Sequence, residues 1–386
     1  MNNSIKNQYP EQFSSKTDNK ILRPLFFKLE EDSDRETLHQ LIKNNPQIVI
    51  IDEIQSQLEE LIKLRHPQEK LSKEGLTEKI KTHLRKTNLD NYGVWVYYPW
   101  RNVLVHLLDK KEFVEVRTNR NQYKITPEEE EVLATKKIGI IGLSVGKAIA
   151  LTIAMERICG EIVLADFDVI ELSNLNRIQT GVHHFNTKKT VVVAREIAEI
   201  DPYLKVTCYH DGLTEANIND FFTKDKKLDI CIEVCDGLEI KILTRQKAKA
   251  LGIPVVMNSS DRGTTDIERF DLDANLPILH GLIEHLDLSK LKEAKTTKEK
   301  AIYLLPMLGV DTLSKRLQAS MPEIEKTITT WPQLASGVIF GGGICTDVCR
   351  RILLNQFSKS GRYFVDIEDQ INNDIEDYIS QKSRTS

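Results

Sequence analysis

Residues 138–147 read Ile-Gly-Ile-Ile-Gly-Leu-Ser-Val-Gly-Lys, and residues 161–168 read Glu-Ile-Val-Leu-Ala-Asp-Phe-Asp. The first stretch is an apolar strand that runs into a glycine turn, and a helix-length apolar segment separates it from the second stretch. The second stretch is another strand, which ends in Asp166 and Asp168. This order is typical of a nucleotide site at the carboxyl edge of a parallel sheet.

The alternation of strand and helix continues beyond this stretch. We expect strands over residues 137–142, 161–166, 205–210, 228–234 and 254–258, with helices over 147–158, 189–200, 215–222 and 238–251. Such alternation predicts an α/β fold with a Rossmann-like, doubly wound, mainly parallel sheet. After Arg262 the pattern weakens to an irregular strand over 268–280, short helices over 288–294 and 311–317, and an apolar, small-residue-rich segment over 335–351 that packs on the sheet.

The length of 386 residues predicts more than one unit. We expect a disordered N-terminus (1–22), a mixed α/β accessory domain (23–125), a nucleotide-binding domain (126–275) and a C-terminal helical extension packing on it (276–386). The accessory domain contains a strand over 46–52 and a helix over 54–64. Its aromatic segment, Trp95-Val-Tyr-Tyr-Pro-Trp100, is predicted to be a packing or dimer surface.

Composition excludes some classes of partner. Hydrophobic residues make up 40% and charged residues 28% of the chain, and the net charge of −4 gives no reason to expect nucleic acid or an anionic membrane as a partner. The sequence has no apolar run of 18 residues. Six scattered cysteines, including Cys345 and Cys349, are expected to be reduced core thiols of a cytoplasmic protein.

The glycine turn offers backbone N–H groups to a phosphate through Gly142, Ser144 and Gly146, at the positive end of the following helix. A tight turn without a ligand is the alternative. A P-loop is excluded because the motif is one residue short and lacks its Ser or Thr. Asp166 is placed to bind ribose hydroxyls, which fits NAD and ATP equally. Asp168 is either a second ligand or a solvated turn residue.

Three charged residues point toward phosphate chemistry. Arg177 lies in the polar loop after the second strand, where a guanidinium can bind oxygens that gain charge in a transition state. Lys188 and Lys189 begin a helix, where a cation opposes the dipole and suggests a nearby anion, although a solvated lysine pair is the alternative. Asp236 follows a third strand and is a candidate Mg²⁺ ligand, or the N-cap of the helix after it.

These residues resemble the ThiF/HesA/MoeB superfamily of ATP-dependent adenylyltransferases, which is related to the ubiquitin-activating enzymes. The resemblance covers residues 137–262, through Asp-Phe-Asp (166–168), Leu-Ser-Asn-Leu-Asn-Arg (172–177), Lys189, Asp-Pro (201–202) and Asp236. It implies that a substrate carboxylate attacks the α-phosphate of ATP to give an acyl-adenylate and pyrophosphate. It also implies that Asp166 holds ribose, that Asn174, Arg177 and Lys189 hold phosphate, and that Asp236 holds magnesium and the nucleotide.

The chain departs from the family pattern in ways that change the expectation. Its glycine turn is one residue shorter than usual, and no cysteine follows Asn258 until Cys345, so we expect no thioester step. The family's N-terminal Arg-Tyr-x-Arg-Gln stretch is absent. Arg117 or Arg120 occupies a comparable place and is expected to act in trans in a homodimer. The long N-terminal region resembles that of a divergent bacterial subgroup.

The expected function is ATP- and Mg²⁺-dependent adenylylation of a carboxylate on a peptide, a carrier protein or a small acid. One alternative is an NAD(P)-dependent oxidoreductase, which explains Asp166 and the glycine turn but leaves Arg177, Lys189 and Asp236 without a role. The other alternative is a non-catalytic nucleotide-binding scaffold of the same fold.

Overall fold

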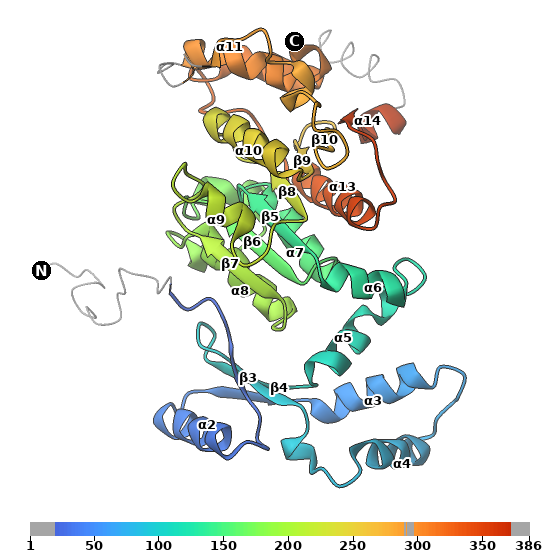
Figure 1. Ribbon diagram of the computed structural model, residues 1–386. Coiled ribbons are helices and arrows are strands. Elements are labelled where there is room, and N and C mark those ends of the chain that lie inside the picture. The colour runs from blue at the N-terminus through green and yellow to red at the C-terminus, as the bar shows by residue number, and fades with distance from the viewer. Residues whose placement is uncertain (1–19, 289–290, 292–296, 372–386) are drawn as a thin grey trace, which may run out of the picture. The chain divides into compact units, whose positions relative to one another are not determined.

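A computed structural model describes residues 20–288, 291 and 297–371 of the chain (Figure 1). The chain divides into two compact units. Unit 1 comprises residues 1–131 and 194–204, and unit 2 comprises residues 132–193 and 205–386. The predicted disorder of residues 1–22 lies, up to residue 19, outside the described residues, and so does most of the predicted helix over 288–294.

Unit 1 contains a four-stranded sheet in the order β1-β3-β4-β2. Its strands are β1 (Leu25–Phe27), β2 (Val49–Asp52), β3 (Val94–Tyr98) and β4 (Val103–Leu107), and its helices include α2 (Asp32–Asn44), α3 (Ile54–Arg65), α4 (Lys73–Leu84) and α5 (Lys110–Thr118). Strand β2 pairs parallel with β4, whereas the other pairs are antiparallel. Val96 and Tyr98 are buried within the unit, so part of the aromatic segment packs in its core.

Unit 2 contains a seven-stranded sheet in the order β11-β10-β9-β8-β5-β6-β7. The strands are β5 (Lys137–Ile141), β6 (Glu161–Ala165), β7 (Lys205–Tyr209), β8 (Ile230–Glu233), β9 (Val255–Asn258), β10 (Thr265–Glu268) and β11 (Gly361–Tyr363). The five strands from β9 to β7 are parallel, and β10 and β11 add an antiparallel edge. The predicted α/β class and mainly parallel sheet are confirmed.

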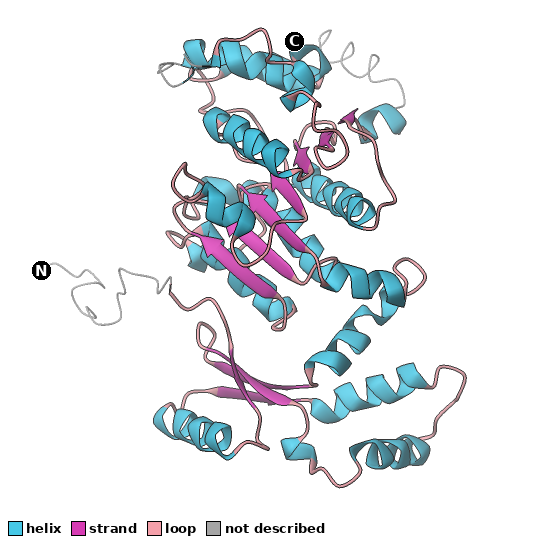
Figure 2. Cartoon of the chain, viewed as in Figure 1, coloured by secondary structure: helices cyan, strands magenta, loops and turns pink. Residues whose placement is uncertain are grey.

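Helices flank the parallel strands, as Figure 2 shows. They are α7 (Gly146–Glu156), α8 (Lys189–Ile200), α9 (Ile218–Thr223), α10 (Leu238–Leu251) and α13 (Ala335–Leu353). Because both faces of the sheet are covered, every residue of β5 and β8 is buried, and these strands read as continuous apolar runs rather than alternating ones. Predicted bounds for α8 and α10 match the structure.

The chain reverses its direction across the sheet between β5 and β8. From β5 the chain adds β6 and β7 on one side, and then returns to add β8 and β9 on the other. In open α/β sheets, the loops at the carboxyl ends of the strands part at this point and leave a crevice for ligands. The loops after β5, β6 and β8 therefore surround the position where a ligand is expected.

The C-terminal part agrees with its prediction in the packing of residues 335–351 on the sheet and differs from it in the two edge strands. The segment over 335–351 is one long helix, α13, which packs against α7 and reaches β9 and β10. Gly342 permits this approach, because a Cβ there would lie 3.1 Å from the backbone of Ala148. The strand near 268–280 is instead β10 and ends at Glu268, and the edge strand β11 was not predicted. Both edge strands are short, with four residues in β10 and three in β11, and each is defined by its pairing with a neighbouring strand.

Further helices follow β10, namely α11 (Thr297–Leu308), α12 (Lys315–Ser320) and α14 (Ile367–Gln370). Within the described part of the chain, every helix is too short or too polar to span a bilayer. All six cysteines are free thiols, and Cys345 and Cys349 are buried on α13, as predicted.

Candidate nucleotide site at the sheet switch point

The glycine turn brings the exits of β5 and β8 into contact. Gly142 follows β5 and has φ +89°, which favours glycine. A Cβ on Gly142 would lie 2.8 Å from the backbone of Cys235, which follows β8, and so it would collide with that loop. Ser144 stands in the middle of the turn, and Gly146 is the first residue of α7. The turn thus needs glycine at 142 because two backbones meet there.

This contact gives a testable expectation for Gly142→Ala. The added methyl group must displace the loop after β8, and overpacking of this kind costs about 1–3 kcal/mol of unfolding free energy. We expect a lower thermal midpoint and a weaker response to any nucleotide that binds the turn. Gly343→Ala is the control, because nothing lies within 4 Å of its added Cβ on α13. Alanine there should raise stability by about 0.5–1 kcal/mol, and equal midpoints for the two variants would contradict the close approach.

Asp166 is buried and shapes the turn. The backbone N–H of Leu143 donates to Asp166 Oδ2 at 2.6 Å, and the N–H of Asp168 donates to Oδ1 at 2.7 Å. Burial raises the pKa of Asp166, and the charge of Lys189 and these two hydrogen bonds partly oppose that rise. Both oxygens of the predicted ribose ligand therefore already hold the backbone of the site.

Lys189 and Asp168 form an ion pair, with Nζ 2.7 Å from Oδ2. The side chain of Lys189 is 6% exposed, and that of Asp168 is 49% exposed. The alternative of a solvated lysine pair is therefore wrong for Lys189. Lys188 donates to the carbonyl oxygens of Phe167 and His210 at 2.7 and 3.1 Å. The lysines at the start of α8 suggested a nearby anion, and Asp168 of the chain itself is one such anion. Because its side chain is 49% exposed, a ligand can still reach this carboxylate.

Arg177 lies against the glycine turn. Its Nε donates to Ser144 Oγ at 3.2 Å, and its Nη1 donates to the carbonyl of Ser173 at 3.3 Å. The short helix before it, Leu172–Asn176, is held by a reciprocal capping arrangement, in which the backbone N–H of Glu171 donates to Asn174 Oδ1 at 3.1 Å. Asn174 is buried and positions the loop. Arg177 instead places its positively charged guanidinium next to the glycine turn.

Asp236 faces the same site from the end of β8. The residue is exposed, and partial desolvation by the neighbouring protein raises the pKa of Asp236. The positive charges of Lys241, Lys189 and Arg177 oppose the rise, and the negative charge of Glu233 adds to it. The N-cap of α10 is Gly237, and it makes no side-chain cap, so the capping alternative for Asp236 is wrong.

A buried charge network lies beneath Asp236 and was not predicted from the sequence. Glu233, at the end of β8, pairs with Arg245 at 2.7 Å and with Lys241 at 3.0 Å, and Arg245 also pairs with Glu268 of β10 at 2.6 Å. Glu233 Oε1 accepts the backbone N–H of Cys235 at 2.9 Å. The network therefore anchors the loop that carries Asp236. Its only sequence signal is a lone glutamate at the end of an apolar strand.

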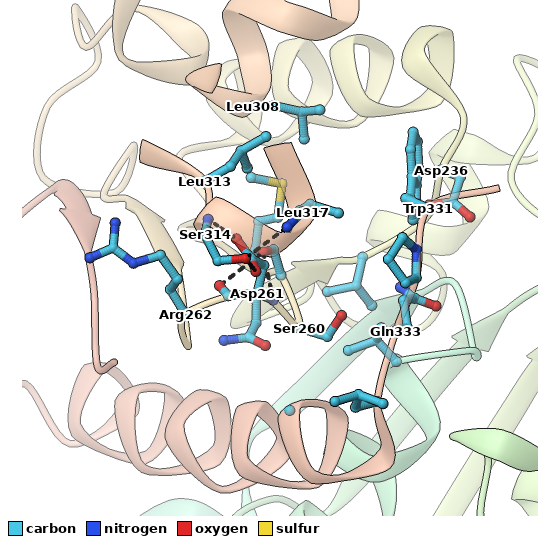
Figure 3. A pocket seen from close by; sticks show the side chains of 18 of the residues that line it. Asp236, Ser260, Asp261, Arg262, Leu308, Leu313, Ser314, Leu317, Trp331 and Gln333 are labelled. Carbon is cyan, nitrogen blue, oxygen red and sulfur yellow. Dashed lines mark hydrogen bonds between the residues drawn. The ribbon is translucent and has the colours of Figure 1, made fainter. Parts of the chain in front are cut away.

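A pocket of about 560 Å³ opens beside Asp236, as Figure 3 shows. Leu308, Leu313 and Leu317 line one part of it, and Trp331 and Gln333 lie on the side of Asp236 (Figure 3). Its lining comes from the ends of β8 and β9, from α11 and α12, and from the segment that leads into α13. No sequence motif marks this pocket, because its residues lie between positions 145 and 368.

The two N-terminal arginines differ in their surroundings within unit 1. Arg117 donates to the buried carboxylate of Asp201 at 3.1 Å, and its side chain is 18% exposed. Arg120 lies in the short helix Asn119–Asn121 and is exposed. Arg117 therefore has a structural role in its own unit, and Arg120 is the more accessible of the two.

Comparisons with known proteins identify relatives of the chain. The sequence model of the ThiF family matches residues 117–332. An uncharacterized protein of Mycobacterium tuberculosis (strain CDC 1551 / Oshkosh) is 45% identical over 273 residues, which are 71% of this chain but only 38% of that protein. The chain thus spans about two fifths of that relative's length.

Two further relatives carry functional names. A molybdopterin-synthase adenylyltransferase of Haemophilus influenzae (strain ATCC 51907 / DSM 11121 / KW20 / Rd) is 24% identical over 193 residues, covering 49% of this chain and 75% of that protein. A crystal structure of the E. coli tRNA N6-threonylcarbamoyladenosine dehydratase, in complex with ATP, is 19% identical with a TM-score of 0.46. It covers 63% of this chain and 95% of that chain.

Proposed function

Because the chain belongs to the ThiF family, we propose that it is an ATP-dependent adenylyltransferase that activates a substrate carboxylate. One carboxylate oxygen forms a bond to the α-phosphorus of ATP, and the bond from that phosphorus to the bridging oxygen breaks. The products are an acyl-adenylate and pyrophosphate, with no oxidant or reductant. The supporting observation is the set of charged groups around the glycine turn, where Asp166 accepts the N–H of Leu143 at 2.6 Å, Arg177 donates to Ser144 at 3.2 Å and Lys189 pairs with Asp168 at 2.7 Å.

Different residues around the turn contact the phosphates and the ribose of ATP. The N-terminus of α7, which begins at Gly146, presents backbone N–H groups to phosphate oxygens. The N–H of Gly142 is not among them, because it donates to the carbonyl oxygen of Ala165 at 2.9 Å. Arg177 adds a guanidinium that stabilises the charge developing on the transferred phosphate, and such positioned charges supply most of the catalysis in this kind of reaction. Since Asp166 already holds the turn, we assign the ribose contact to the exposed Asp168.

Asp236 is the proposed magnesium ligand. Among the described residues, no three His, Cys, Asp or Glu side chains gather into a ligand cluster. This fits Mg²⁺ in a nucleotide site, because the ion is commonly held by one or two carboxylates together with phosphate oxygens and water. When bound, the ion would neutralise charge on the leaving pyrophosphate.

We propose that no thioester step follows adenylylation. Cys235 is the thiol nearest the site, and burial raises its pKa, so it is protonated and a weak nucleophile at neutral pH. Cys345 and Cys349 are buried on α13. The acyl group of a peptide, carrier protein or small acid would then pass directly to an acceptor. The six free thiols support a cytoplasmic location.

We also propose a homodimer in which Arg120 reaches the partner's nucleotide. The exposure of Arg120 supports this, and the ion pair with Asp201 makes Arg117 the weaker candidate. Arg120→Ala should lower turnover and leave the thermal midpoint unchanged. Mixing it with the Asp236→Ala variant should restore part of the activity, because one site of a mixed dimer is complete. An Arg120→Ala variant with full activity would exclude the role in trans.

Two measurements test the proposed activity. Saturating ATP at about 100 times its dissociation constant should stabilise the fold by about 2.7 kcal/mol, which differential scanning calorimetry detects as a higher midpoint. ATP–pyrophosphate exchange with candidate carboxylates should then be measurable and should be absent without the acid. Stabilisation by NADH in place of ATP would support the oxidoreductase alternative. Tight ATP binding without any exchange would support the scaffold.

A further inference from the structure

We propose that the pocket beside Asp236 binds the acyl substrate, and that this substrate is a small carboxylic acid with a bulky aliphatic or aromatic body. The inference rests on the proposed adenylylation and names the class of acid that the site accepts. The volume of the pocket, about 560 Å³, is within the usual range for sites that enclose a small organic ligand.

The wall of the pocket is apolar. It contains side chains from the end of α11, from α12 and from their connections, namely Leu304, Met307, Leu308, Leu313, Leu317 and Met321. An extended glycine-rich peptide end would leave this wall in contact with water. An aliphatic chain or aromatic ring would instead remove both surfaces from water, which is the favourable process in such sites.

Two pairs of polar groups line the pocket, whereas the buried Oδ1 of Asn258, which also lines it, has no hydrogen-bond partner. Asp261 accepts hydrogen bonds from Ser314 Oγ and the Ser314 backbone at 2.6 and 2.8 Å. Arg262 pairs with Asp366 at 2.5 Å and donates to the carbonyl of Thr312 at 2.8 Å. Figure 3 shows the Asp261–Ser314 pair beneath the leucines. Because these groups already have partners, the body of the ligand need not supply polar atoms to them.

We place the carboxylate end of the ligand at the side of the pocket where Asp236 lies. The lining of the pocket includes Val145 of the glycine turn as well as Asp236, so the pocket begins next to the proposed phosphate site. The two regions are also connected directly, because Asn176 Nδ2, one residue before Arg177, donates to the carbonyl of Gln333 on the pocket rim at 2.8 Å. An acid whose body fills the leucine wall can thus present its carboxylate toward the α-phosphate.

The first test measures binding without ATP. Acetate, hexanoate, octanoate and 4-phenylbutyrate are titrated into the full chain by isothermal titration calorimetry. Affinity should rise by about fourfold for each methylene added along the aliphatic series, until the pocket is filled. Leu308→Asn should weaken octanoate binding at least tenfold. Leu305→Asn, on the same helix but outside the pocket lining, should leave it unchanged. Leu317→Asn in α12 replaces Leu308→Asn if that variant does not fold.

Affinity that is independent of chain length, or equal in Leu308→Asn and wild type, would overturn the pocket assignment. The second test measures ATP–pyrophosphate exchange with the same acids and with peptides ending in Gly-Gly or in leucine. Exchange with octanoate or 4-phenylbutyrate supports the proposal, and exchange with peptides alone overturns it. Octanoate binding together with ATP binding, but without exchange for any acid, would refute the adenylyltransferase function while supporting an apolar ligand in the pocket.

Discussion

Arg177→Ala should reduce ATP–pyrophosphate exchange by about 10²–10³-fold, the loss typical when one positioned donor to a developing charge is removed. The side chain contacts Ser144 and the carbonyl of Ser173, and these contacts do not form part of a buried core. The free energy of unfolding should therefore remain within about 0.5 kcal/mol of that of the wild type. Exchange rates and calorimetry on the same preparations separate the two effects.

Two companion variants make this result specific. Arg177→Lys keeps the charge but loses the planar, bidentate donor, so it should recover only part of the lost rate. Arg351→Ala removes an exposed arginine of α13 that pairs with Asp347 at 2.7 Å, and it should leave exchange unchanged. If Arg177→Ala exchanges as fast as Arg351→Ala, the proposed phosphate contact does not exist.

Glu233→Gln should lower the free energy of unfolding by about 3–5 kcal/mol, because it leaves the buried charges of Arg245 and Lys241 without one of their partners. Urea unfolding measures this loss. The control, Asp347→Asn, removes a carboxylate that is 40% exposed and pairs with Arg350 and Arg351, and ion pairs in contact with solvent contribute at most about 1 kcal/mol. Equal losses in the two variants would show that the network beneath Asp236 does not stabilise the fold.

The pH dependence of this effect has a definite sign. Burial by itself would raise the pKa of Glu233, but the charges of Lys241 and Arg245 hold that pKa below its usual value of 4.5. A carboxyl group with a lowered pKa in the folded state contributes stability above its unfolded pKa, and that contribution is lost as the pH falls through the folded value. The difference between wild type and Glu233→Gln should thus be constant above about pH 5 and shrink below pH 4.5. A difference that grows in acid would contradict the charge assignment.

The sheet was predictable because its signals are local. An apolar run such as 138–141, followed by Gly142, specifies a buried strand and a turn without reference to the rest of the chain. The exact bounds of α8 and α10 followed for the same reason, since Pro202 and Gly252 end their apolar periodicity. Strands β10 and β11 escaped prediction because short edge strands depend on their neighbours rather than on their own composition.

Candidate site residues were chosen by type and spacing, which do not show what each side chain contacts. The sequence placed Asp166 and Asp168 side by side as possible ligands, and only the folded backbone distinguishes the buried acceptor of two N–H groups from the exposed partner of Lys189. In the same way, Asn174 was predicted to hold phosphate, yet its side-chain oxygen accepts the N–H of Glu171. Hydrogen-bond partners follow from three-dimensional geometry, which spacing along the chain does not contain.

By itself the sequence determined the order of the five parallel strands and of the helices between them, the glycine turn and the set of charged residues after the strands, because each of these is encoded within a few neighbouring positions. Tertiary structure alone decided the contact of Gly142 with the Cys235 backbone, the Glu233–Arg245–Glu268 network and the leucine-walled pocket. Those features join segments separated by 12 to more than 200 positions. Their formation depends on how buried surfaces pack, and a linear pattern does not record that packing.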